Sequence, residues 1–87
     1  MTSESAGAAS PLRAVVEVVV KALVDKPDSV RVTEHERRGM TILELTTAPN
    51  DMGKIIGRQG RTAAALRTLV AVTAEKHGKR AQLDIRD

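Results

Sequence analysis

The residues best suited to chemistry form a short glycine turn, "IIGRQG", at residues 55–60. Glycine has no Cβ atom, so another backbone can come close to Gly57 and Gly60. A long alanine-rich run follows, and the N–H groups of the first turn of a helix there would lack intrahelical partners. The polar side chains of the turn and its flanks are Lys54, Arg58, Gln59 and Arg61. Together these features suit the binding of a phosphate backbone.

The spacing of these glycines does not match the common phosphate-binding loops. A Walker loop needs a second glycine where Arg58 stands, followed by Lys and Ser or Thr. A dinucleotide fingerprint needs a glycine at the position of Ile55. On spacing alone, the pattern is therefore equally typical of a plain helix–turn–helix corner that uses glycine for tight packing.

The rest of the sequence contains no recognisable catalytic or metal-binding set. It has no cysteine, and its two histidines, His35 and His77, lie far apart in the chain. Metal sites need several clustered ligands, and no Ser, Thr or carboxylate pair lies near a plausible general base. We therefore expect a binding protein rather than an enzyme, with no cofactor and no metal.

The basic residues are concentrated in the half of the chain that holds the glycine turn. Residues 51–87 contain eight Lys or Arg against four Asp or Glu, whereas residues 1–50 contain six against seven. This asymmetry indicates a polyanionic partner, although an inert basic surface would have the same composition. The chain has no aromatic residue, so base–aromatic stacking cannot contribute to binding.

The length of 87 residues suffices for one domain. The first ten residues, "MTSESAGAAS", are small and polar and predict a disordered leader. They include neither a basic residue nor the apolar block of a secretory signal. No apolar run approaches the roughly 20 residues of a membrane span. We therefore expect a cytoplasmic protein with no membrane partner.

The first structured element, residues 10–25, could be a strand or a helix. Five valines in six residues favour a strand, but the apolar residues repeat with helical spacing. Ser10 can cap a helix and Pro11 suits its first position, so we predict a helix. The stripe expected to cover a sheet is Leu12, Val15, Val16, Val19, Ala22 and Leu23. The further apolar residues Ala14, Val18, Val20 and Val24 indicate either a protein interface or deeper burial.

The remaining pattern predicts two strands, two helices and a last strand. Residues 30–36 and 40–47 alternate as a hairpin joined by the loop "ERRG" at residues 36–39. A short helix at 51–56 and a long helix at 61–77 follow, and residues 80–86 form the last strand. Because two helices precede that strand, it should pair parallel to the second strand. The expected fold is a two-layer α+β sandwich, α-β-β-α-α-β, with the helices on one side of a three-stranded sheet.

This order, together with "IIGRQG" before a helix, resembles the KH domain in its type II, bacterial arrangement. The shared motif is an apolar pair, a glycine, two polar or basic residues and a second glycine. The likeness runs from about Leu12 to Arg86, which predicts a KH domain over residues 11–87. The segments "VDKPDSVRV", "LELTTAPNDMGKIIGRQGRTAAALRTLV" and "GKRAQLDI" are similar to the small bacterial single-KH proteins of the KhpA family.

The resemblance implies binding of single-stranded RNA, with about four nucleotides of backbone clamped at the glycine turn against an apolar groove. One isoleucine of Ile55 and Ile56 should line the groove and the other should lie in the core. The loop at 36–39 corresponds to the variable loop across the groove, which makes Arg37 and Arg38 candidate phosphate contacts. The predicted RNA-binding residues are Arg37, Arg38, Lys54, Ile55, Ile56, Gly57, Arg58, Gln59, Gly60 and Arg61.

The resemblance also implies a biological role and a partner. It suggests an RNA chaperone or post-transcriptional regulator that is linked to cell-wall homeostasis and cell length. It suggests a homodimer, or a pair with a larger Jag-like KH protein. The alternative function is a protein–protein adaptor in which the glycine corner is structural. Duplex DNA binding by that corner is a third class, but the exposed face expected there is poor in base-reading side chains.

Overall fold

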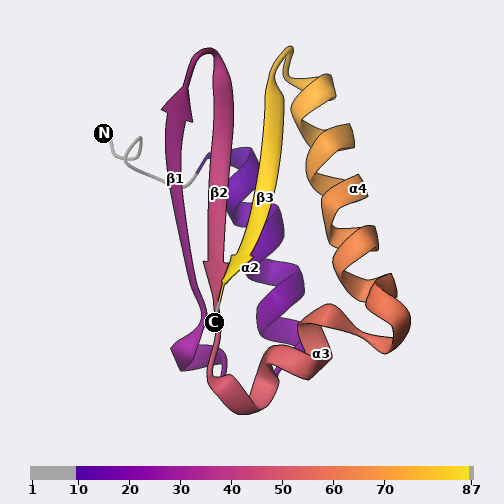
Figure 1. Ribbon diagram of the computed structural model, residues 1–87. Helices are drawn as coiled ribbons and strands as arrows, with labels where there is room; N and C mark the ends of the chain where they lie inside the picture. Colours follow the sequence, from indigo (N-terminus) through magenta and orange to yellow (C-terminus); the bar gives the residue numbers. More distant parts are fainter. Residues whose placement is uncertain (1–9, 87) are drawn as a thin grey trace.

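The computed structural model describes residues 10–86 and arranges them in two layers, a sheet and a layer of helices (Figure 1). The leader predicted for residues 1–10 lies outside the described residues, except for Ser10. The order of elements is the predicted α-β-β-α-α-β. The helices and strands are α2 (Pro11–Leu23), β1 (Arg31–Arg37), β2 (Met40–Thr46), α3 (Met52–Ile56), α4 (Arg61–Lys76) and β3 (Arg80–Arg86).

The sheet has the strand order β1-β2-β3. β1 and β2 are antiparallel, whereas β2 and β3 are parallel, with Leu43 opposite Leu83. The predicted parallel pairing of the last strand is therefore confirmed. In Figure 1, α2 passes behind the sheet and α4 stands to the right of β3. Both helices pack against the strands through the same buried cluster, and no helix of residues 10–86 covers the opposite face of the sheet. Across residues 10–86, every helix is too short or too polar to span a membrane.

An aliphatic core fills the space between the sheet and the helices. On β2, alternate residues point to the helices because successive side chains of a strand face opposite sides. Leu43 and Leu45 are fully buried there, and Leu83 of β3 is 3% exposed. The helices contribute Leu66 and Val70 of α4 and the buried row of α2 to the same cluster. This core forms without any aromatic side chain.

Helix α2 begins where its sequence predicts. The Ser10 side chain accepts a hydrogen bond from the backbone N–H of Arg13 at 3.2 Å, and Pro11 takes the first helical position. These two features stabilise the helix end and exclude the strand that the valines could have formed.

The side of α2 that is buried differs from the predicted stripe. The row Leu12, Val16 and Val20 faces the core, whereas Leu23 is 42% exposed and Ala22 is also exposed. A helical wheel shows an apolar arc, but the arc of α2 is wider than the surface it buries. The rotation of the helix is therefore decided by its contacts with β1 and α4, and the prediction for Ala22 and Leu23 was wrong.

The hairpin turn is also tighter than predicted. Arg37 pairs with Met40, so only Arg38 and Gly39 lie outside the strands. Both have positive φ, 53° and 80°, as a two-residue turn of this twist requires. The predicted loop at 36–39 therefore shrinks to two residues, and Arg37 belongs to β1.

Candidate nucleic-acid interface

The glycine turn reverses the chain between α3 and α4. Helix α3 has only five residues and ends at Gly57, whose φ and ψ are 76° and 170°. A short 3₁₀ turn, Arg58–Gly60, then includes Gln59 at φ 57° and Gly60 at φ 74°. Helix α4 follows directly at Arg61. Three positive φ angles within four residues make this the most unusual backbone of the described chain.

The two glycines of the motif meet different structural requirements. A Cβ atom on Gly57 would lie 2.2 Å from Thr62 Oγ1 and 2.8 Å from the Thr62 backbone nitrogen. A Cβ atom on Gly60 would meet nothing within 4 Å. Gly57 is therefore needed for a close approach of backbone to backbone, whereas Gly60 is needed only for its left-handed conformation.

The tip of the turn presents polar groups to solvent. Arg58, Gln59 and Arg61 are all exposed. The Arg61 guanidinium donates a hydrogen bond from Nη2 to Gln59 Oε1 at 3.0 Å, which holds these two side chains together. Gly60 supplies no side-chain cap to the 16-residue α4, so the N–H groups of the first turn have no side-chain acceptor. The positive end of the helix dipole and the cationic side chains of the turn therefore lie on the same surface. The arrangement attracts anions.

The two isoleucines before the turn point to opposite environments. Ile55 is 0% exposed and belongs to the core cluster, whereas Ile56 is 39% exposed. The prediction that one isoleucine lies in the core and the other at the surface is confirmed. Ile56 is the one that a ligand can reach. The choice could not be read from the sequence because both residues are isoleucine and α3 is little more than one turn long.

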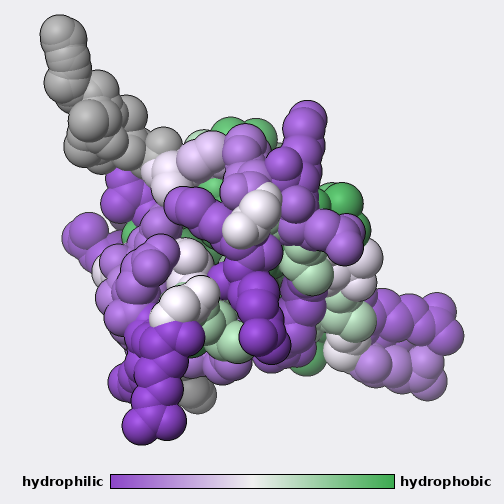
Figure 2. Space-filling view, turned by 90° about the horizontal axis from the view of Figure 1, so that it is seen from above, coloured by the Kyte–Doolittle hydropathy of each residue, from purple (hydrophilic) through white to green (hydrophobic). Residues whose placement is uncertain are grey.

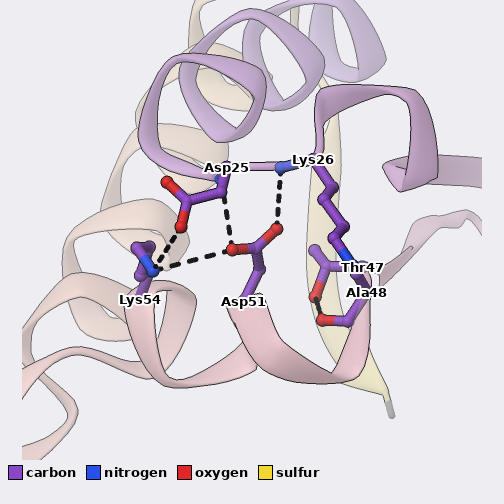
Figure 3. Close-up of polar contacts among 6 residues, drawn as sticks. All are labelled: Asp25, Lys26, Thr47, Ala48, Asp51 and Lys54. Atoms are coloured by element: carbon purple, nitrogen blue, oxygen red, sulfur yellow. Dashed lines mark hydrogen bonds and ion pairs between the residues drawn. The ribbon is translucent and has the colours of Figure 1, made fainter.

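A buried carboxylate attaches α3 to the end of α2 (Figure 3). Asp51 accepts hydrogen bonds from the backbone N–H groups of Asp25, at 3.1 Å, and Lys26, at 3.0 Å. Lys54 Nζ lies 3.2 Å from Asp25 Oδ2 and 3.7 Å from Asp51 Oδ1. The Asp51 side chain is only 2% exposed. This cluster, Asp25–Asp51–Lys54, fixes the helix that leads into the glycine turn.

The pKa values of Asp51 and Lys54 are both shifted in the direction that keeps these two groups charged at neutral pH. Burial raises the pKa of Asp51, but hydrogen bonds from the backbone of Asp25 and Lys26 and the charge of Lys54 outweigh it, so the pKa lies below its ordinary value. The hydrogen bond and charge of Asp25 raise the pKa of Lys54. Lys54 is thus a cation already shared by two carboxylates. Asp51 is the residue before α3, but its side chain makes no cap hydrogen bond to that helix.

Arg37 and Arg38 do not lie beside the glycine turn. They end β1 and begin the β1–β2 turn, at the top of Figure 1, whereas α3 and the glycine turn lie at the bottom. The intervening strand of seven residues spans about 20 Å. The two arginines and the glycine turn therefore lie at opposite ends of the sheet, and the role of Arg37 and Arg38 as phosphate contacts stays a prediction. A two-residue hairpin cannot reach back along the sheet.

The described residues contain no candidate metal centre. No three histidine, aspartate or glutamate side chains in residues 10–86 lie close enough together to hold an ion. The polar cluster next to the turn consists of a lysine and two aspartates in direct contact.

The sequence matches the KH domain of the KhpA/KhpB family over residues 13–85. The chain belongs to this family. It is 50% identical over 76 residues to the RNA-binding protein KhpA of Halalkalibacterium halodurans, which covers 87% of this chain and 100% of the relative. It is 47% identical to the RNA-binding protein KhpA of Aquifex aeolicus, which covers 87% of this chain and 96% of the relative. The family consists of RNA-binding proteins and not of enzymes.

A solved structure shares the fold. The crystal structure of Aquifex aeolicus Era bound to GDP and aluminium fluoride superposes with a TM-score of 0.55 and 20% sequence identity. The match covers 88% of this chain and 31% of the Era chain. This chain of the KhpA/KhpB family has a three-stranded sheet of mixed direction and the element order α-β-β-α-α-β. It therefore has the type II KH fold.

Proposed function

We propose that the chain binds single-stranded RNA and clamps the sugar–phosphate backbone at the glycine turn. The observation that carries the proposal is the turn itself. Gly57 leaves no room for a Cβ atom, and the exposed Arg58 and Gln59 stand in front of the uncapped start of α4. Membership of a family whose relatives are named RNA-binding proteins supports the same ligand.

Each residue of the turn and its flanks has its own proposed role in RNA binding. Arg58 and Arg61 contact phosphates, because both are exposed cations at the positive end of a helix dipole. Gln59 is held by Arg61 and offers hydrogen bonds to sugar or phosphate oxygens. Ile56 offers an apolar surface to a base. Lys54 supports the turn through its two carboxylates more than it contacts RNA.

The test is the variant Arg58→Asp with Gln59→Asp, measured by equilibrium binding of single-stranded RNA. Arg67→Asp with Thr68→Asp makes the same change in charge at two exposed positions of α4 and serves as the matched control. We expect the turn variant to lose most RNA affinity and the control to keep it, with both folded in thermal melts. Wild-type affinity in the folded turn variant would refute the clamp and favour the adaptor function.

The binding is expected to be weak, salt-dependent and modest in sequence preference. The chain has no aromatic residue, so it forgoes the roughly 1–3 kcal/mol per base that aromatic stacking supplies elsewhere, and phosphate contacts dominate. Weak, reversible contacts suit an RNA chaperone or post-transcriptional regulator acting in the cytoplasm. We infer a connection to cell-wall homeostasis and cell length, which measurement of cell length after deletion of the gene would test.

A protein partner is proposed from the outer face of α2. Val18 is 69% exposed, and with Ala14, Val15 and Val19 it lines a shallow apolar hollow of about 350 Å³. We propose that a second copy of the chain covers this face, because an uncharged valine surface is complementary to itself about a two-fold axis. A larger Jag-like KH protein is the alternative occupant.

Sedimentation of the wild type and of Val18→Glu tests the dimer, with Lys21→Glu on the same helix as the control. Val20 is unsuitable for this purpose because it is 0% exposed. We expect dissociation in the Val18 variant alone. If the wild-type protein stays monomeric at high concentration and also does not bind the Jag-like protein, the interface is refuted.

A further inference from the structure

The face of the sheet opposite the helices has no covering element among residues 10–86. Strand register places alternate residues of the three strands on this side, because side chains alternate along each strand. We call it the open face. Its residues are Arg31, Thr33, His35 and Arg37 of β1, Met40, Ile42, Glu44 and Thr46 of β2, and Arg80, Gln82, Asp84 and Arg86 of β3.

The positive charges of the open face are incompletely neutralised. Of its two carboxylates, Glu44 pairs with Arg86 at 3.1 Å, and Asp84 accepts a hydrogen bond from Gln82 at 2.9 Å. Four arginines on or next to this face have no carboxylate of residues 10–86 within ion-pair distance. They are Arg31, Arg37, Arg38 and Arg80.

Three of these arginines gather at the hairpin end of the sheet. Arg37, Met40 and Arg80 are directly opposite one another across the three strands, and Arg38 is the next residue of the turn. Strands lie about 4.8 Å apart, so Arg37 and Arg80 stand about 10 Å apart on the two outer strands. We call Arg37, Arg38 and Arg80 the arginine row. The residues that lie opposite one another at this level of the sheet are Arg37, Met40 and Arg80, and none of them is a carboxylate.

The surface at this end is hollowed and hydrophilic. A depression of about 520 Å³ begins at Arg37 and Arg38 and runs along the open face; its lining also includes His35, Met40, Ile42, Glu44, Gln82, Asp84 and Arg86. Of its two carboxylates, Glu44 is paired with Arg86 and Asp84 accepts from Gln82, and Arg80 lies at the edge of the row, outside this lining. Seen from above, at the end where the β1–β2 turn lies, the molecule is covered mainly by hydrophilic side chains (Figure 2). The apolar residue at the centre of the face, Ile42, is only 8% exposed.

We propose that the arginine row binds the phosphodiester backbone of a second RNA segment, separate from the segment held at the glycine turn. Guanidinium groups match phosphate geometry with paired donors, and backbone contacts need cations more than base-reading side chains. Protein interfaces depend most on Trp, Tyr and Arg anchors packed in desolvated pockets, whereas this face carries no aromatic side chain and its central Ile42 is only 8% exposed, which favours RNA over a protein partner. This inference rests on the proposed RNA-binding function.

The two surfaces lie at opposite ends of the molecule (Figure 1). The length of β2, about 20 Å for its seven residues, separates them. One protein therefore holds two RNA segments at a fixed spacing, which raises the effective concentration of one segment near the other. The domain then promotes the annealing of complementary strands, and this supplies a physical basis for chaperone activity.

The experiment compares two double variants. The arginine variant carries Arg37→Glu and Arg80→Glu, and the control variant carries Lys21→Glu and Lys76→Glu. All four positions are exposed, and both pairs change the charge equally, but the lysines lie in the helical layer. Binding of a 30-nucleotide single-stranded RNA is measured across salt concentrations, and annealing of two complementary RNA strands is measured beside it. Removing two phosphate contacts should reduce the slope of log K against log salt by about 1.4. We expect this reduction, and slower annealing, only in the arginine variant.

The outcomes separate this inference from the proposed clamp. A wild-type slope and wild-type annealing in the arginine variant would overturn the second surface, while the glycine-turn variant still tests the clamp independently. If the glutamates impair folding, Arg37→Gln with Arg80→Gln should still flatten the slope, and Arg37→Lys with Arg80→Lys should retain it. A competition experiment tests whether the arginine row prefers phosphodiesters to other anions. If polyglutamate displaces the bound RNA and competitor RNA of equal charge does not, the assignment is overturned.

Discussion

The first glycine of the turn should be far less replaceable than the second. Gly57→Ala places a methyl group in a backbone region, φ 76° and ψ 170°, that costs a residue with a side chain about 1–3 kcal/mol. The same methyl group would lie 2.2 Å from Thr62 Oγ1 and 2.8 Å from the Thr62 nitrogen. Rotating the threonine side chain relieves the first contact but not the second, because the second involves backbone at the start of α4.

The magnitudes separate the two substitutions. The backbone cost of Gly57→Ala and an overpacking cost of about 1–3 kcal/mol together lower the free energy of unfolding by about 2–6 kcal/mol. Gly60→Ala meets no neighbour within 4 Å and loses only about 1–2 kcal/mol for a left-handed alanine. In a domain of this size, each kcal/mol lowers Tm by about 4–8 °C. We expect Gly57→Ala to melt at least about 8 °C below the wild type.

Thermal melts and RNA binding check this prediction together. Gly60→Ala serves as the matched control, and Gly57→Ala with Thr62→Ala tests the cause. That double variant should recover only part of the stability, since the backbone nitrogen of residue 62 remains. Equal melting temperatures for the two glycine variants, with wild-type RNA affinity in Gly57→Ala, would refute the requirement for backbone approach at this position.

Three further predictions concern the residues that support the turn. Asp51→Asn should destabilise the domain at neutral pH; the lowered pKa of Asp51 means that its stabilisation is present above its ordinary pKa and lost as pH falls through the folded value. The melting temperatures of wild type and variant should therefore converge in acid, and a constant difference would contradict this. Lys54→Gln should reduce RNA affinity less than Arg58→Gln in filter binding, because Lys54 is already shared by two carboxylates; an equal loss would make Lys54 a direct phosphate contact. Ile55→Asp should unfold the domain in a circular-dichroism melt, since Ile55 is 0% exposed, whereas Ile56→Asp should leave it folded and weaken RNA binding, and the reverse order would contradict the assignment of the pair.

The local features of this chain were decided by its sequence. Ser10 and Pro11 start α2 through a cap and a restricted φ, and these depend only on neighbouring residues. The type and order of the six main elements follow from the period of their apolar residues. The parallel pairing of β3 follows from the two helices before it, because a parallel strand needs a long crossover. The glycine turn was recognisable because its residues are adjacent in the chain.

Contacts between distant residues decided the rest. The wheel of α2 contains a wide apolar arc, and only packing against β1 and α4 selected the row of Leu12, Val16 and Val20 as its buried side. The partners of the Asp51 carboxylate lie 25 and 26 residues earlier in the chain, where no local pattern indicates them.

The site itself shows the same division. The motif predicted where the glycine turn lies, but the placement of Arg37 and Arg38 depended on the length of the hairpin and the direction of the strands. A two-residue turn kept both arginines at the far end of the sheet. Their distance from the glycine turn is set by the seven residues of β2, and the face they share with Arg80 is set by cross-strand register, which exists only once the sheet has formed.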